Sequence, residues 1–224
     1  INSLHEETSA KVAGEVKKMG RKSLAIAADI TKKEGADRVV RESIDAFGRI
    51  DILVNNAGFY PLRGFLEVDE PFLKKVMDVN LNAALWMCQQ MIRRRHRRGG
   101  VIINVSSIEA VLPFERHLSA YSISKSGIIA LTRSLAKEYG GQGFRVNALI
   151  PGGIITPGTR AVARGVGRGD VRLIRTGIEF RLRLPIGRGG RPDEVARMAL
   201  VLASDLASYV HGALIPVDGG FLSA

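Results

Sequence analysis

The chain alternates short apolar runs with longer segments in which apolar residues recur at helical spacing. Each run has the length of a strand and is largely apolar throughout, which indicates strands covered on both faces of a parallel sheet. The predicted strands cover residues 23–28, 50–55, 101–106, 145–150 and 213–217. The predicted helices cover residues 6–19, 33–47, 70–98, 120–139 and 192–204. This alternation predicts an α/β fold with helices on both faces of a doubly wound parallel sheet, in three layers.

One segment, residues 152–191, departs from this alternation. It is rich in glycine, carries nine arginines and shows weak periodicity, so we predict a loop or lid over a substrate site. The sequence contains no internal repeat and no low-complexity linker. We therefore expect a single domain over residues 1–224.

The composition narrows the class of protein. Of the 224 residues, 46% are hydrophobic and 25% are charged, which suits one domain with a sizeable core. The lone cysteine, Cys88, excludes an intrachain disulfide and a structural zinc site. We therefore expect no bound metal and a reducing, cytoplasmic location. No apolar run approaches the length of a membrane span, and no signal segment opens the chain.

The overall charge is strongly basic. Lys and Arg number 33 against 22 Asp and Glu, which gives a net charge of +11, and such an excess attracts anions. Nucleic acid, an acidic carrier protein, and a phosphorylated cofactor or substrate all fit this balance. A basic surface that only keeps the protein in solution fits it equally well.

The strongest chemical signal is the pair Tyr121 and Lys125, near the start of the helix predicted at 120–139. Residues four apart lie side by side on one face of a helix. A neighbouring ammonium favours the phenolate, so we expect Lys125 to lower the pKa of Tyr121 from about 10 towards neutrality. Tyr121 would then act as a general acid and base.

Four loops bring further polar and small residues to the same place. They follow predicted strands and begin at Asp29, Asn55, Ser106 and Pro151. Ligands of an open α/β sheet bind outside the carboxyl ends of its strands, so these loops should line one crevice. Because side chains alternate along a strand, only one of Ser106 and Ser107 can face this crevice, and we select Ser107.

Together, these motifs resemble those of the short-chain dehydrogenase/reductase family over essentially the whole chain. The residues that carry the resemblance are Asp29-Ile30, Asn55–Gly58, Asp78–Asn80, Ile103–Ser107, Tyr121 with Lys125, Arg145–Asn147, Pro151–Thr156 and Val217–Gly220. The resemblance implies a Rossmann-like fold. It also implies an oxidoreductase that interconverts a ketone and a secondary alcohol by hydride transfer, with NADP or NAD as cofactor.

The resemblance further implies roles for individual residues. Tyr121 would exchange a proton with the substrate oxygen, and Lys125 would lower the pKa of Tyr121 and hold the nicotinamide ribose. Ser107 would hydrogen-bond the substrate oxygen, and Asn80 would order a water that links Lys125 to solvent. The implied cofactor-binding residues are Asp29 and Ile30 at the adenine, Asn55, Ala57 and Gly58 at its ribose, Tyr121 and Lys125, and Pro151, Gly152, Ile154 and Thr156 at the nicotinamide carboxamide and phosphate.

The chain departs from the family's pattern at its beginning, where the glycine-rich turn that binds the pyrophosphate is absent. We therefore expect about 30 further residues before Ile1, forming the first strand, the first helix and most of the second strand. The absent strand belongs between the strands predicted at 23–28 and 50–55, so its loss would leave an unpaired apolar edge. We expect the 224-residue chain to turn over no cofactor and an extended chain to be active.

The preference between NAD and NADP depends on Ser3. This residue takes about the place where NAD-preferring members of the family carry an acid that grips the ribose hydroxyls. Because no acid stands there to repel a 2′-phosphate, we expect NADP to be preferred.

The sequence is compatible with several classes of substrate. The basic run Arg93–Arg98 ends a predicted helix and would suit docking of an acidic acyl carrier, as in the ketoacyl-carrier-protein reductases that the chain resembles. A solvated basic helix end explains this run at least as well. Sugar, polyol and steroid dehydrogenases of the same family are further alternatives.

The sequence also bears on two kinds of macromolecular partner, nucleic acid and further copies of the chain. A nucleic-acid-binding protein on a dehydrogenase scaffold would interleave aromatic residues with its arginines for base stacking, and Arg93–Arg98 contains none. We therefore expect no nucleic acid partner. Small residues in the helix predicted at 120–139 would permit close helix pairing, and the resemblance favours a homo-oligomer, a dimer or tetramer. These residues are Ser122, Ser126, Gly127 and Ala130.

Overall fold

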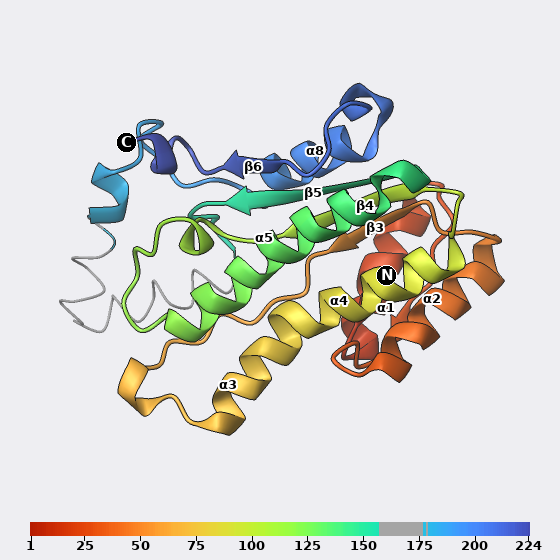
Figure 1. The fold of residues 1–224 in the computed structure, drawn as a ribbon, viewed down its shortest axis with the longest axis horizontal. Coiled ribbons are helices and arrows are strands. Elements are labelled where there is room, and N and C mark those ends of the chain that lie inside the picture. Colours follow the sequence, from red (N-terminus) through yellow and green to blue (C-terminus); the bar gives the residue numbers. More distant parts are fainter. Residues whose placement is uncertain (157–176, 178) are drawn as a thin grey trace.

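The computed structural model describes residues 1–156, 177 and 179–224. Its centre is a parallel sheet of four strands in the order β3-β4-β5-β6 (Figure 1). These strands are β3 (Ile52–Asn55), β4 (Gly100–Val105), β5 (Phe144–Pro151) and β6 (Leu214–Val217). Two short strands, β1 (Asn2–Ser3) and β2 (Ile26–Ala27), form a separate parallel pair.

Helices occupy most of the connections between the strands. They are α1 (Glu6–Lys18), α2 (Lys33–Phe47), α3 (Glu70–Met77), α4 (Ala83–Arg94), α5 (Ser119–Tyr139) and α8 (Pro192–Ala203). Short 3-10 helices lie at Phe65–Glu67, Ile108–Ala110, Gly140–Gln142, Asp205–Ala207 and Phe221–Ser223. The single helix predicted at 70–98 is two helices, because a π-helical stretch at Asp78–Asn82 joins α3 to α4. Asp69 begins α3 by accepting the N–H of Phe72 at 2.8 Å.

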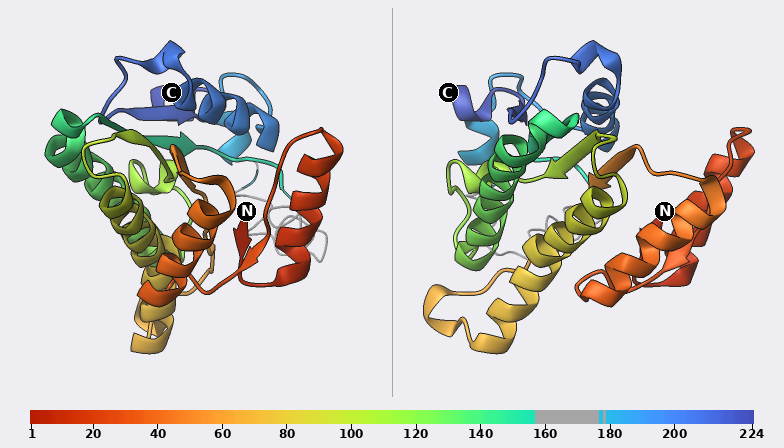
Figure 2. Two further views of the ribbon diagram at one scale, coloured as in Figure 1. Left: turned by 90° about the vertical axis from the view of Figure 1, so that its right-hand side faces the viewer. Right: turned by 45° about the vertical axis from the view of Figure 1, so that its right-hand side comes forward.

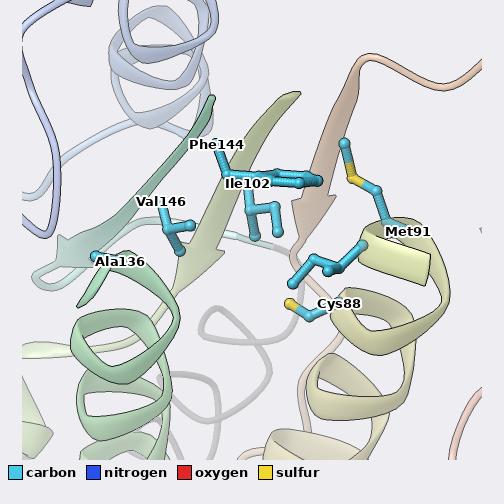
Figure 3. Close-up of a cluster of buried hydrophobic side chains, with 7 residues drawn as sticks. Cys88, Met91, Ile102, Ala136, Phe144 and Val146 are labelled. Atoms are coloured by element: carbon cyan, nitrogen blue, oxygen red, sulfur yellow. The ribbon is translucent and has the colours of Figure 1, made fainter. Parts of the chain in front are cut away.

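Helices cover both faces of the four-stranded sheet. On one face, Met91 of α4 packs against Ile102 of β4 and Phe144 of β5, as Figure 3 shows. On the other face, Ile103 of β4 packs with Leu202 of α8. Burial of these side chains supplies the main favourable contribution to the free energy of folding. The predicted three-layer α/β arrangement is therefore confirmed.

The first two strands stand apart from the main sheet. Figure 2 shows β1, β2 and α1 to one side of β3, and packing of α2 on α4 joins the two parts. Among the residues that the structure describes, β3 is an edge strand, and its Ile52 and Val54 are 47% and 48% exposed. The sequence predicted an unpaired apolar edge at this place, and the structure shows one.

Two residues of the family motif Arg145–Asn147 have structural roles. Arg145 of β5 donates hydrogen bonds to the main-chain oxygens of Leu202 and Ser204 at 2.9 and 3.1 Å. It thereby satisfies carbonyl groups at the C-terminal end of α8. The side chain of Asn147 spans the loop before β6 through hydrogen bonds of 2.8 and 3.0 Å.

The predicted lid at 152–191 is described only at its ends. Residues 157–176 and 178 lie outside the described part of the chain. At the ends, Ile154 forms a β-bridge with Gly190, so the beginning and the end of the segment lie side by side. In the part that is described, no helix is both long enough and apolar enough to cross a membrane.

Candidate active site

A cavity of about 500 Å³ opens at the carboxyl ends of β4 and β5. Loops after β3, β4 and β5 and the beginning of α5 form its walls. Of the predicted catalytic residues, Ser107, Tyr121 and Lys125 line the cavity. Of the predicted cofactor-binding residues, those on the cavity wall are Gly58, Pro151, Gly152, Ile154 and Thr156, besides Tyr121 and Lys125. Three of the four predicted loops therefore meet at one site.

Lys125 lies at the floor of this cavity and is only 4% exposed. Its Nζ donates a hydrogen bond to the main-chain oxygen of Val105 at 2.8 Å. Burial lowers the pKa of Lys125 to about 8, because a charged ammonium is poorly solvated there. The ammonium and neutral amine forms are therefore both accessible near physiological pH.

The pKa of Tyr121 is raised, which corrects the expectation that Lys125 lowers it. Burial causes the rise, and a hydrogen bond from the Ser107 hydroxyl opposes it. Lys125 contributes little because its Nζ is directed at Val105 and lies 5.9 Å from the centre of the Tyr121 ring. The ring of Tyr60 packs edge-on against Tyr121 at 4.8 Å and helps to enclose it. In this structure Tyr121 is a protonated phenol at neutral pH.

Ser106 and Ser107 differ in their partners. The Ser107 hydroxyl forms a hydrogen bond with the Tyr121 hydroxyl. It also accepts the N–H of Glu109 at 3.2 Å. The Ser106 hydroxyl instead donates to the main-chain oxygen of Lys125 at 2.8 Å. Only Ser107 therefore contacts the phenol, whereas Ser106 fastens the end of β4 to α5.

Asn80 lies in the π-helical stretch between α3 and α4 and is 2% exposed. Its Oδ1 accepts the N–H of Phe59 at 2.7 Å, and its Nδ2 donates to the Phe59 oxygen at 2.9 Å and to Ser124 Oγ at 3.0 Å. The side-chain amide is thus occupied by protein groups, so it holds the loop after β3 in place. The Oδ1 atom keeps a second lone pair, and the water-ordering role expected for Asn80 stays a prediction.

The remaining predicted cofactor-binding residues lie off the cavity wall. Asn55 Nδ2 donates to Asn104 Oδ1 at 2.8 Å, so this side chain is turned into the protein. Asp29 Oδ1 accepts the N–H and the hydroxyl of Thr31 at 3.0 and 2.6 Å. Ile30 packs into the apolar cluster around α2, and Ala57 is not among the cavity residues. None of these four residues therefore forms part of this cavity.

Sequence reasoning missed a buried polar chain beneath the site. Asn55 donates to Asn104 of β4, whose Nδ2 donates to Thr132 Oγ1 of α5 at 2.9 Å. Thr132 in turn donates to the Ile128 oxygen at 2.8 Å. Asn104 and Thr132 are both fully buried. The available signal was Asn104 itself, a polar residue inside an otherwise apolar predicted strand.

Sequence reasoning also missed several residues of the cavity wall. Tyr60, Glu109, Phe114, Glu115 and Phe180 all line the cavity. They lie outside the predicted strands and helices, so no periodicity indicated their direction. Among the described residues, no group of three or more His, Cys, Asp or Glu side chains could hold a metal ion.

Comparisons with known proteins give similarity over the whole chain. A family model described as Enoyl-(Acyl carrier protein) reductase matches residues 1–222. A short-chain dehydrogenase/reductase of Aspergillus oryzae, astE, is 40% identical over 220 residues, which cover 96% of this chain and 80% of that protein. An L-rhamnose 1-dehydrogenase (NAD(P)(+)) of Azotobacter vinelandii is 36% identical over 213 residues, which cover 93% and 79%. The crystal structure of a gluconate 5-dehydrogenase from Burkholderia cenocepacia in complex with NADP and tartrate is 28% identical. It has a TM-score of 0.89, and the match covers 100% of this chain and 85% of that one.

Proposed function

The chain belongs to the short-chain dehydrogenase/reductase family, and we propose that it interconverts a secondary alcohol and a ketone with NAD or NADP as hydride carrier. The observation that carries this proposal is the convergence of Ser107, Tyr121 and Lys125 on one cavity at the carboxyl edge of the sheet. A phenol beside a hydroxyl offers two hydrogen-bond donors to one substrate oxygen.

The reacting oxygen is placed between the hydroxyls of Ser107 and Tyr121. In reduction, negative charge develops on this oxygen, and the two hydroxyls would turn to donate to it and so stabilise the charge. Tyr121, held protonated by burial, transfers its proton to the oxygen as the alcohol forms. When bound, the nicotinamide supplies the hydride for reduction and accepts it in oxidation. In oxidation, the same phenol takes the proton back.

Lys125 supports Tyr121 when the phenol has lost its proton. In this structure the ammonium is held by the Val105 oxygen; we propose that it turns towards the phenolate once Tyr121 has given up its proton and then stabilises the negative charge. Because its pKa is about 8, Lys125 can also release a proton near neutral pH and so restore the phenol.

The cavity fits the nicotinamide half of such a cofactor. Gly58 presents bare main chain there, and a Cβ at this position would lie 3.6 Å from Lys125 Nζ. A larger side chain would therefore fill the space beside the lysine. We propose that Pro151, Gly152, Ile154 and Thr156 hold the nicotinamide carboxamide and phosphate, and that Tyr121 and Lys125 hold its ribose. Asp29, Ile30, Asn55 and Ala57 would contact the adenine half, Asn55 through its main chain.

NADP is the proposed preference over NAD. Ser3 ends β1, and its hydroxyl donates to the main-chain oxygen of His5. A serine at this place leaves room for a 2′-phosphate, whereas an acid would repel it. The test compares kcat/KM for the two cofactors in the wild type and in Ser3→Asp. A Ser3→Asp protein that still favours NADP as strongly as the wild type would contradict this assignment.

The alternative of acyl-carrier docking at Arg93–Arg98 is disfavoured by position. This run begins in the last turn of α4 and ends just before β4, so it lies at the amino ends of the strands, opposite the cavity (Figure 1). Ion pairs to Asp37 at 3.0 Å and to Asp51 at 3.1 Å also neutralise Arg94 and Arg95. A carrier bound there would hold its acyl group far from Tyr121. We propose a free small-molecule substrate and a homo-oligomeric protein.

The test is a screen that follows the absorbance of reduced nicotinamide with sugars, polyols, steroids and an acyl-thioester ketone. We expect turnover of at least one secondary alcohol or ketone. Binding of nucleic acid at physiological ionic strength, with no binding of either nicotinamide cofactor, would instead favour a basic binding protein on this scaffold.

A further inference from the structure

We infer that the substrate is an uncharged polyhydroxylated compound, an alditol or aldose, and that Glu109 and Glu115 select it against substrates that carry a carboxylate or phosphate. The inference rests on the proposed function and names the substrate class for the same site. Three features carry it: the position of the two carboxylates, the lack of an ion pair to either of them within the described residues, and an aromatic wall beside them.

Glu109 lies two residues beyond Ser107, within the same turn of the chain. It lines the cavity although it is only 5% exposed. Its two oxygens accept the N–H groups of Phe114 and Glu115 at 3.1 and 3.0 Å, which fixes the carboxylate at the cavity wall. Each oxygen keeps a second lone pair for a hydroxyl donor. Glu115 is half-buried and lines the same cavity.

In the part of the chain that is described, no ion pair balances the negative charge of this wall. Lys125 also lines the cavity, but its ammonium is held by the Val105 oxygen. Among the residues that the structure describes, neither Glu109 nor Glu115 forms an ion pair; the charged neighbour that acts on Glu115 is His117. The field of both carboxylates reaches Tyr60, whose pKa is raised first by burial and then by these two charges. A second anion brought into this space would meet like charges in a poorly solvated site, which is unfavourable.

Aromatic rings form the apolar part of the wall. The Phe114 ring packs edge-on against Phe180 and Phe221, with centroids 5.8 and 5.3 Å apart. Phe180 also stacks on Phe221 at 5.1 Å and lies over Gly153, where a Cβ would come within 2.3 Å of its ring. The Glu109 bond to the Phe114 N–H holds this arrangement in place.

Aromatic faces and carboxylates together suit a polyol. The C–H groups of a sugar or alditol pack against the rings, and its hydroxyls donate to the carboxylate oxygens. A steroid would offer the apolar contact but few donors for Glu109 and Glu115. A sugar acid would offer the donors but add an opposing charge.

The test compares galactitol with galactonate, which share a carbon skeleton and differ in one carboxylate. Burial raises the pKa of Glu109 and of Glu115, so the comparison is made at about pH 8.5 to favour their ionised forms. There we expect kcat/KM for galactitol to exceed that for galactonate by about tenfold or more. As a readout that needs no turnover, galactitol should raise the melting temperature of the cofactor-bound protein more than galactonate does.

Substitution of each carboxylate, with a control elsewhere, shows which residues set the preference for galactitol over galactonate. Glu115→Gln removes one charge and leaves both hydrogen bonds of Glu109 to the main chain intact, so it should narrow the preference for galactitol several-fold. Glu138→Gln is the matched control, because it removes the same charge from the exposed, opposite end of α5 and should leave the preference unchanged. Glu109→Gln should lower the ratio of kcat/KM for galactitol to kcat/KM for galactonate more than Glu115→Gln does.

The results of these measurements can contradict the inferred substrate class without contradicting the proposed function. Equal use of galactitol and galactonate, or a preference that Glu115→Gln and Glu109→Gln both leave intact, overturns the inference. Turnover of other alcohols with no binding or oxidation of any polyol also overturns it, while the proposed function stands. If no alcohol or ketone is turned over at all, the proposed function fails and the inference fails with it.

Discussion

The Lys125 ammonium is held by the main-chain oxygen of Val105, 2.8 Å from Nζ, beneath the ring of Tyr121. This contact joins α5 to the last residue of β4. It also explains why the lysine can be buried, because one of its donors has a protein partner where water is excluded.

The burial of Lys125 predicts a specific dependence of stability on pH. Its pKa is about 8 in the folded protein and about 10.4 in the unfolded chain. Between these pH values the unfolded chain binds a proton that the folded protein has released, so the free energy of unfolding rises with pH in this window. The gain should reach roughly 2–3 kcal/mol and should be lost below about pH 8.

Urea denaturation between about pH 7.5 and 10 checks this dependence. Lys125→Met should lack the rise, so the difference between wild type and variant, plotted against pH, isolates the lysine. Tyr60 and Tyr121 have raised pKa values and affect both proteins alike. Parallel pH curves for the two proteins would contradict the buried-lysine account.

Ser106 and Ser107 should separate into a structural and a functional residue. Ser107→Ala removes the hydroxyl that meets Tyr121, so kcat/KM should fall about 100-fold with little change in stability. Ser106→Ala removes the bond to the Lys125 oxygen, so the free energy of unfolding should fall by about 1 kcal/mol. Steady-state kinetics and urea denaturation of both variants test this division. The reverse pattern would show that Ser106 faces the substrate.

The buried chain from Asn55 through Asn104 to Thr132 should be important for stability. Asn104→Ala leaves the Asn55 amide and the Thr132 hydroxyl without their partner, at a cost of about 2–3 kcal/mol. Ser134→Ala, at an exposed position on the same helix, should cost less than about 0.5 kcal/mol. The denaturation midpoints of the two variants provide the comparison. An Asn104→Ala protein as stable as the Ser134→Ala control would contradict this role.

The exposed apolar edge at β3 should promote association between copies of this chain. An uncovered strand with Ile52 and Val54 exposed offers both unpaired main-chain groups and apolar surface. Ile52→Lys should therefore reduce concentration-dependent light scattering of the 224-residue chain, whereas Thr8→Lys, at an exposed position on α1, should not. Equal scattering by both variants would show that the edge is not involved.

Much of the fold could be predicted because parallel strands have a simple signature. Continuous apolar runs placed the central strands within a residue or two of β4 and β5. Helical spacing placed Tyr121 and Lys125 on one face of α5. Both inferences use local regularity, which the sequence displays directly.

What could not be predicted depends on contacts distant in sequence. The π-helical stretch at Asp78–Asn82 is invisible to periodicity, because the apolar pattern continues through it. The Asn55 side chain turns inwards because Asn104 of a neighbouring strand accepts its hydrogen bond. The pKa of Tyr121 rises because of its burial, which spacing alone does not reveal.

The central claim is that the Tyr121 hydroxyl exchanges the proton of the reaction. The most direct measurement is kcat/KM of Tyr121→Phe, with melting temperature and NADP binding measured alongside. We predict a fall of about 1,000-fold with fold and cofactor binding retained. A Tyr121→Phe protein that keeps its fold, binds NADP and turns over substrate within about twofold of the wild type would contradict the account.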